Sequence, residues 1–176
     1  MYDVYDSQYN PWTDSKVTTV KFPGGLTSIG YGMFTYTTKL KELNLAGTQV
    51  KTINGNAFRN SGITTVYLPP TLTEIVNSAF WDCSDLEVIR VDVGNKTYDS
   101  RDKCNAVIKT ATNKLVMGGN KTVIPSTVKI IGESAFRGRT KLTSLGLHDA
   151  VEEIESFAYA GCTALKSAFI PAGVRY

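Results

Sequence analysis

The sequence predicts a solenoid of the α/β class, built from about six coils of 23 residues with short strands on one face and turns or short helices on the other. Three observations predict it. An apolar pattern returns every 23 residues, a proline often follows the apolar segment, and an aromatic residue recurs at one place in the repeat. A single coil cannot bury its own apolar side chains, so we expect each coil to stack on its neighbours.

The strand of each coil follows from alternating apolar residues. Each repeat begins with one apolar residue, and two more follow three and five positions later. The first positions are Val17, Leu40, Ile63, Leu86, Leu142 and Leu165. This alternation predicts a strand whose first, fourth and sixth positions face the core. In four repeats the strand is followed directly by a proline, which ends it, at Pro23, Pro69, Pro125 and Pro171.

The second half of each coil carries three further columns of recurring residues. An isoleucine recurs at Ile29, Ile53, Ile75, Ile131 and Ile154. A small or flexible residue then precedes an aromatic one, in the pairs Met33-Phe34, Ala57-Phe58, Ala79-Phe80, Ala135-Phe136 and Ala158-Tyr159. Three residues past the ring comes a small residue, at Thr37, Ser61, Cys83 and Cys162, whereas Arg139 breaks this column. The fixed period favours core ladders over a ligand-stacking strip, and it favours buried cysteines over nucleophiles.

An insert interrupts the repeats between the fourth and fifth coils. Within it, the apolar runs NAVIK and KLVMG flank the turn-forming stretch TATN, which predicts a hairpin. We expect an insertion of this size to lie as a loop on one face of the solenoid. The predicted organisation is one domain over 1–176, with an N-terminal cap (1–16), repeats (17–91), the insert (92–121) and further repeats (122–176).

Both ends of the chain depart from the repeat. The cap carries Tyr2, Tyr5, Tyr9 and Trp12, which we expect to cover the first coil. The last coil stops before its isoleucine and aromatic positions, and an uncovered edge would invite self-association. We therefore expect the native array to be longer, an expectation that a natural stop codon after Tyr176 would rule out.

Composition and motifs argue against several classes of function. The net charge of +3 is spread along the chain, which does not favour nucleic-acid binding, and no apolar run approaches the roughly 20 residues of a membrane span. The start of the chain lacks a signal-peptide pattern, although a mature chain would lack one too. Three scattered cysteines predict neither a zinc site nor a disulfide framework.

No common enzyme motif is present, and His148 is the only histidine. We predict no catalytic activity and no cofactor; a hydrolase using Glu152 and Glu153 is a remote alternative. The acids Asp92, Asp99 and Asp102 are interspersed with basic residues and do not follow a calcium-loop pattern, so no metal is predicted. Asn95 and Asn120 each begin a short match to the glycosylation acceptor pattern.

The repeat pattern LxxIxIPxxVxxIGxxAFxxCxx resembles the leucine-rich repeat of the bacterial surface antigen (BspA-like) family. Residues 63–85 and 124–140 match it well, and the insert resembles the family's stretch YDSRxxCNAIIxTATNxL. The resemblance implies a right-handed leucine-rich-repeat solenoid that is secreted or located at a bacterial cell surface. It also implies a function in binding and adhesion, with host or bacterial surface proteins or extracellular matrix as partners.

Outward-facing strand positions are the candidate binding residues. The third and fifth positions of the strands face away from the core, which gives the candidates Lys21, Asn44, Tyr67, Arg90, Glu42 and Thr65. Tyrosine and arginine are frequent at binding hot spots, so Tyr67 and Arg90 come first. Two alternatives stay open: a glycan-binding module using Tyr67, Trp81 or Phe169, and a passive spacer or targeting module of a larger surface protein.

Overall fold

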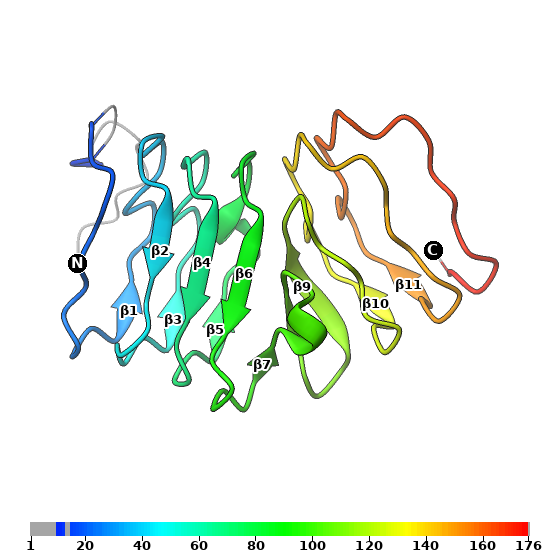
Figure 1. Ribbon diagram of the computed structural model, residues 1–176, viewed down its shortest axis with the longest axis horizontal. Coiled ribbons are helices and arrows are strands. Elements are labelled where there is room, and N and C mark those ends of the chain that lie inside the picture. Colours follow the sequence, from blue (N-terminus) through cyan, green and yellow to red (C-terminus); the bar gives the residue numbers. More distant parts are fainter. Residues whose placement is uncertain (1–9, 13–14, 176) are drawn as a thin grey trace.

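Short strands stack side by side along the solenoid in the computed structural model, which describes residues 10–12 and 15–175 (Figure 1). Two parallel three-stranded sheets run through the first coils. One sheet contains β1 (Ser28–Ile29), β3 (Thr52–Ile53) and β5 (Glu74–Ile75). The other contains β2 (Glu42–Asn44), β4 (Thr65–Leu68) and β6 (Val88–Val91). The predicted solenoid is confirmed.

The helical component of the predicted class is small. Within the described residues it consists of the 3-10 helices η2 (Asn77–Phe80) and η3 (Arg101–Lys103), and elsewhere turns join the strands. The fold is therefore best described as a β-solenoid of about six turns.

The recurring columns form the expected ladders before the insert. Ile29 pairs with Ile53 and Ile53 with Ile75 in register. The rings of Phe34 and Phe58 stack with centroids 5.3 Å apart, and those of Phe58 and Phe80 stack 5.1 Å apart. These rings lie in the apolar core and do not form an exposed strip. Since like residues occupy like places, each coil covers the apolar side of the next.

The insert contains the predicted hairpin, but its predicted location on one face was wrong. β8 (Ala106–Lys109) and β9 (Lys114–Gly118) pair antiparallel. β9 also pairs in parallel with β10 (Ile130–Ile131), which pairs with β11 (Glu153–Ile154), while β7 (Tyr98–Asp99) pairs with β8. β9 thus takes the place that a strand of the isoleucine column has in other coils.

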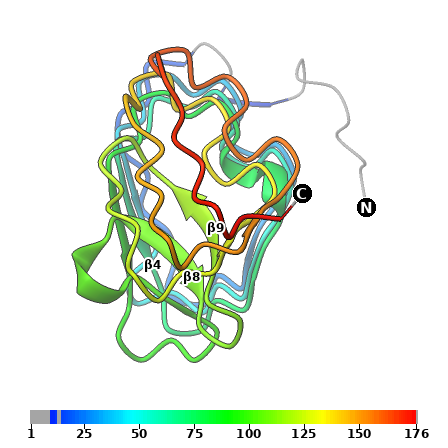
Figure 2. The same cartoon turned by 90° about the vertical axis from the view of Figure 1, so that its right-hand side faces the viewer.

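The hairpin lies inside the solenoid and divides its core. Viewed along the solenoid, β8 and β9 fall within the outline drawn by the other coils (Figure 2). Val107 and Met117 pack with the core of the preceding coils, whereas Ala106, Ile108 and Leu115 pack with that of the following coils. NAVIK and KLVMG are apolar because both faces of the hairpin are buried. We call the coils before the insert the N-terminal stack, those after it the C-terminal stack, and the boundary between them the seam.

Three predicted strands are absent from the structure. Residues 17–22, 142–147 and 165–170 contribute to no sheet. In the second of these segments Gly146 has a φ of 64°, which is incompatible with an extended strand at its fifth position. The other two segments belong to the first and last described coils.

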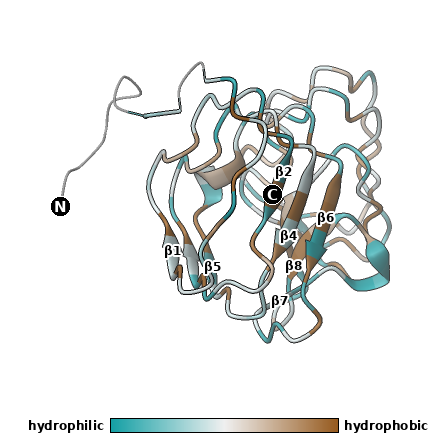
Figure 3. Cartoon of the chain, turned by 60° about the vertical axis from the view of Figure 1, so that its left-hand side comes forward, coloured by the Kyte–Doolittle hydropathy of each residue, from teal (hydrophilic) through white to brown (hydrophobic). Residues whose placement is uncertain are grey.

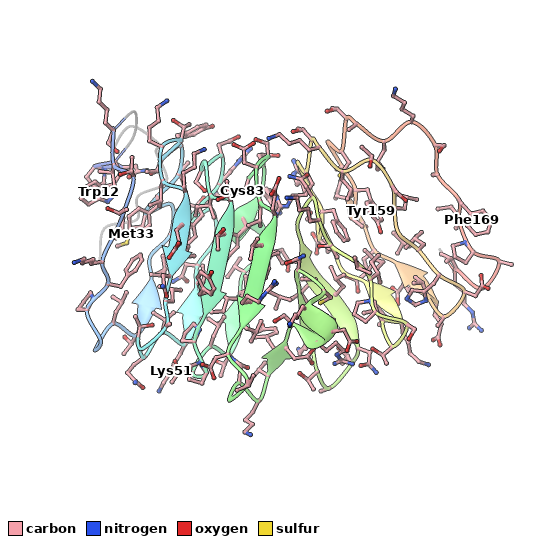
Figure 4. The ribbon with its side chains drawn as sticks, in the orientation of Figure 1. Trp12, Met33, Lys51, Cys83, Tyr159 and Phe169 are labelled. Atoms are coloured by element: carbon pink, nitrogen blue, oxygen red, sulfur yellow. The ribbon has the colours of Figure 1, made fainter. Side chains whose placement is uncertain are left out.

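The outermost coils are covered to different degrees. The ring of Trp12 stacks on Phe34 with centroids 6.2 Å apart, as expected of a cap, whereas Tyr2, Tyr5 and Tyr9 fall outside the described residues. At the opposite end Phe169 is 74% exposed (Figure 4). None of the helices in the described ranges is long and apolar enough to cross a membrane.

Candidate binding face

The sheet β2-β4-β6 presents its alternate side chains outward, as the sequence predicts. Leu43, Val66 and Ile89 point inward and are fully buried. The neighbouring positions pair across the strands in two rows, Glu42-Thr65-Val88 and Asn44-Tyr67-Arg90. We call these six outward residues the sheet face. Figure 3 shows largely hydrophobic colouring along β6, interrupted by a hydrophilic stretch.

Tyr67 lies at the centre of the sheet face. Its side chain is 37% exposed, and its backbone pairs with Asn44 on one side and Arg90 on the other. Asn44 is exposed. Its Oδ1 accepts a hydrogen bond from the amide of Ala46 at 3.0 Å, and its Nδ2 donates one to the carboxylate of Glu42 at 3.4 Å. Parallel pairing fixes the spacing of these side chains, so they form a preorganised polar surface with one central aromatic group.

Arg90 is held by the insert. Its Nη1 donates to Asn105 Oδ1 at 2.6 Å and to the carbonyl of Ile89 at 2.8 Å, and the side chain is only partly exposed. The Ser100 hydroxyl accepts a hydrogen bond from the Val91 amide at 3.0 Å. Residues 100–105 therefore border the sheet face, and η3 projects outside the ring of coils (Figure 2).

The bordering segment has an uncommon backbone. Asp102, Lys103 and Asn105 have φ values of 56°, 54° and 53°, in the left-handed region that costs most residues about 1 kcal/mol or more. Sequence reasoning missed Ser100 and Asn105 as parts of the surface. The only sequence feature that could have suggested them is that the insert begins directly after the strand that carries Arg90.

The remaining candidates are spread more widely. Glu42 is exposed and Thr65 is half-buried within the sheet face. Lys21 is exposed but belongs to a segment that is not a strand. At the edge of the face, Lys41 and Lys141 both contact Asp85, at 3.5 and 2.8 Å. This rim therefore carries charges of both signs.

Two of the aromatic residues considered for glycan binding lie away from the sheet face. The guanidinium of Arg137 lies 4.2 Å from the ring centroid of Trp81 and that of Arg59 lies 5.9 Å from it. Trp81 is thus engaged by protein cations. Phe169 is at the far end of the molecule (Figure 4). The three aromatic groups do not form one platform.

The cysteines are structural. Cys83, Cys104 and Cys162 are all buried and free. Burial raises the pKa of each thiol, which disfavours the reactive thiolate. The thiols of Cys83 and Cys162 donate to the carbonyls of Phe58 and Phe136, at 3.0 and 3.1 Å, so this column links each coil to the preceding one. The prediction that Cys83 and Cys162 are buried small residues is confirmed.

Other polar groups of the insert are occupied by protein contacts. Burial raises the pKa of Asp99, but hydrogen bonds from Arg101 and Thr110 more than offset it and leave that pKa below its ordinary value. The amide nitrogens of Asn95 and Asn120, candidate glycosylation sites, donate to backbone carbonyls. No cluster of three or more metal-binding side chains occurs in residues 10–12 and 15–175.

Comparisons with known proteins agree with this architecture. A family model described as a BspA-type leucine-rich repeat region, in six copies, matches residues 8–112 and 118–176. A search of curated protein sequences finds no match.

Two solved structures share the fold at low sequence identity. The pneumococcal vaccine antigen PcpA superposes with a TM-score of 0.72 at 22% identity, over 85% of this chain and 38% of the antigen. A leucine-rich-repeat protein from Eubacterium ventriosum gives a TM-score of 0.59 at 18% identity, over 99% of this chain and 66% of that protein. This chain therefore spans well under half of the antigen's length.

Proposed function

Since the chain belongs to the BspA-type leucine-rich-repeat family, we propose that it is a non-catalytic binding module at a bacterial cell surface, with protein partners on host cells, on other bacteria or in the extracellular matrix. Leucine-rich-repeat solenoids generally serve as binding scaffolds and not as enzymes. The structural neighbour PcpA is a pneumococcal vaccine antigen, which supports a surface location.

The observation that carries the proposal is the sheet face. Tyr67 stands exposed between two polar neighbours on a backbone fixed by parallel pairing. Such an anchor loses little conformational entropy on binding, which favours affinity. The sheet face also lies next to the insert, which supplies a raised border at Arg90 through Asn105. A flat sheet with one raised side suits a folded protein surface better than a small molecule.

The test is a binding comparison between Tyr67→Ala and a matched control. The purified protein is titrated against immobilised extracellular-matrix proteins and intact host cells. We expect Tyr67→Ala to weaken saturable binding at least tenfold, equivalent to about 1.4 kcal/mol. Lys51→Ala removes another exposed side chain, located away from the sheet face (Figure 4), and should leave affinity unchanged.

Other outcomes separate the rival functions. Binding that survives both Tyr67→Ala and Asn44→Ala would place the partner on another surface. Binding to a glycan array that disappears in Tyr67→Ala would favour the glycan-binding alternative. If the protein binds neither proteins, cells nor glycans, the spacer alternative would be favoured and the adhesion proposal rejected.

A further inference from the structure

A buried arginine stands at the seam. Arg139 is 2% exposed, and it forms no salt bridge with the carboxylates of the described ranges. Its Nε donates to the carbonyl of Gly118 at 2.7 Å, and its Nη1 lies 3.0 Å from the carbonyl of Phe80 and 3.3 Å from that of Cys83. Nη1 also bonds the carbonyl of Arg137. Arg139 thus contacts the N-terminal stack, the hairpin and its own coil.

The charge of Arg139 is not neutralised by these contacts. Carbonyl groups stabilise a cation through their dipoles but carry no net charge. Asp82 is an acidic residue close enough to interact electrostatically with Arg139, but its carboxylate lies 3.4 Å from Arg59 Nε. Nη2 of Arg139 donates to none of the described groups. A buried and unneutralised charge is costly in a protein interior.

A small cavity lies beside this arginine. Its volume is about 10 Å³, room for roughly one water-sized sphere. Trp81, Ser134 and Arg139 line it, together with Asn77 and apolar residues of both stacks and of β9. Trp81 Nε1 and Ser134 Oγ are buried and have no hydrogen-bond partner in the described structure. Buried polar atoms are rarely left unpaired, so two of them on residues that line one cavity point to a bound species.

The unpaired groups are mainly donors. The indole nitrogen of Trp81 and Nη2 of Arg139 can only donate, and the Ser134 hydroxyl can donate as well. A water molecule accepts about two hydrogen bonds and must then donate two. Among the side chains that line the cavity, only Ser134 and Asn77 contain oxygen. An anion would instead accept from every donor and would also neutralise Arg139.

We propose that this cavity binds a monovalent anion of halide size, chloride in ordinary solution, through Arg139, Trp81 and Ser134. Trp81 precedes the insert in the chain, whereas Ser134 and Arg139 follow it. The anion therefore joins the N-terminal and C-terminal stacks at the seam, and chloride stabilises the folded state by mass action. The site is independent of the proposed binding function, because none of its residues belongs to the sheet face.

Two measurements test for the anion directly. In thermal unfolding, replacing gluconate by chloride at a constant ionic strength of about 0.5 M should raise Tm by about 3 °C, since gluconate is too large for the cavity. In crystals soaked in bromide, an anomalous scattering peak should lie between Trp81, Ser134 and Arg139. An ordered water in the cavity without a bromide peak would overturn the proposal.

A pair of tryptophan variants separates the site from general salt effects. Trp81→Phe keeps a ring beneath Arg137 but removes the N–H donor, and we expect it to lose at least half of the chloride-dependent shift in Tm. Trp12→Phe makes the same change at the N-terminal end, where Trp12 stacks on Phe34, and should retain the whole shift. Equal shifts in Trp81→Phe and the unmodified protein would also reject the site.

Discussion

The N-terminal and C-terminal stacks are built from the same repeat but differ in their sheets. The N-terminal stack has two parallel sheets and three stacked phenylalanine rings, Phe34, Phe58 and Phe80. In the C-terminal stack β10 and β11 continue one sheet only, and among its residues up to 175 one ring pair forms, Phe136 and Tyr159 with centroids 5.0 Å apart. The same repeat pattern thus forms a strand only where the neighbouring coils keep their strands in register.

The hairpin is the place where the aromatic ladder of the N-terminal stack is interrupted. Gly118 of β9 donates its amide hydrogen to the carbonyl of Ala135 at 2.8 Å, whereas in the N-terminal stack Phe58 makes the matching bond to Ala79. A glycine therefore stands where other coils have an aromatic residue, and the aromatic ladder has a gap. Arg139 bridges this gap with a long side chain that reaches Phe80, which a cysteine in that column could not do.

Truncating one buried ring in each stack should destabilise the protein more than any other change considered below. Phe58 has a ring on either side, whereas Phe136 stacks on one ring of the described chain, that of Tyr159. Both are buried, so each change to alanine should cost about 3–5 kcal/mol of unfolding free energy, with Phe58→Ala the larger. Urea unfolding measures both. A small loss of unfolding free energy in Phe136→Ala would show that the Phe136–Tyr159 ring pair does not belong to the core.

A smaller effect is expected where the gap in the ladder is filled. A Cβ on Gly118 would lie 2.1 Å from Phe136 Cε1, so Gly118→Ala should displace that ring and cost about 1–3 kcal/mol. Gly25→Ala is the matched control, because a Cβ there meets nothing within 4 Å. If both variants unfold at the same urea concentration, Gly118 does not define the close approach of hairpin and coil.

A stabilising change is expected in the last described turns of the C-terminal stack. Phe157 is 64% exposed and has a φ of 57°, at the place where the N-terminal stack has Gly32 and Asn56. Asparagine tolerates this conformation better than phenylalanine, so Phe157→Asn should raise stability by about 1 kcal/mol. A Tm shift of a few degrees upward measures it. A lower Tm would mean that the contact of Phe157 with Arg137 outweighs the strain.

The smallest effect concerns an ion pair across the seam. Asp85 accepts a hydrogen bond from Lys141 of the C-terminal stack at 2.8 Å. This bond is the main cause that lowers the pKa of Asp85 below its ordinary value, and the charges of Lys141 and Lys41 lower it further. Partial burial acts in the opposite direction but is outweighed. A carboxyl group whose pKa is lower in the folded than in the unfolded state stabilises the fold at pH values above its unfolded-state pKa. This stabilisation is lost as the pH falls through the folded-state pKa.

Asp85→Asn should therefore destabilise the protein by about 0.5 kcal/mol at pH 7, as a partly exposed pair does, and by progressively less below about pH 4. Unfolding by urea at several pH values provides the measurement. A difference that stays constant down to pH 2 would show that the carboxylate's charge is not responsible.

Much of the fold could be predicted from the sequence because a periodic fold repeats its constraints. Ile53, Phe58 and Cys83 each occupy a column whose members recur at the same spacing, so their burial follows from the period. The outward direction of Asn44 and Tyr67 follows from strand alternation. The site residues beyond them could not be predicted in the same way, because Asn105 reaches Arg90 only through the path of the insert.

The solenoid, its ladders, its hairpin and the outward rows of the sheet face can be read from the amino-acid pattern, since these depend on local periodicity. The position of the hairpin within the core, the room that Gly118 leaves for Phe136 and the burial of Arg139 at the seam become visible only in the folded chain. The physical reason is that an insert has no period. Its contacts depend on which backbone groups and apolar faces the flanking coils leave open, and these are set only when all the coils have stacked.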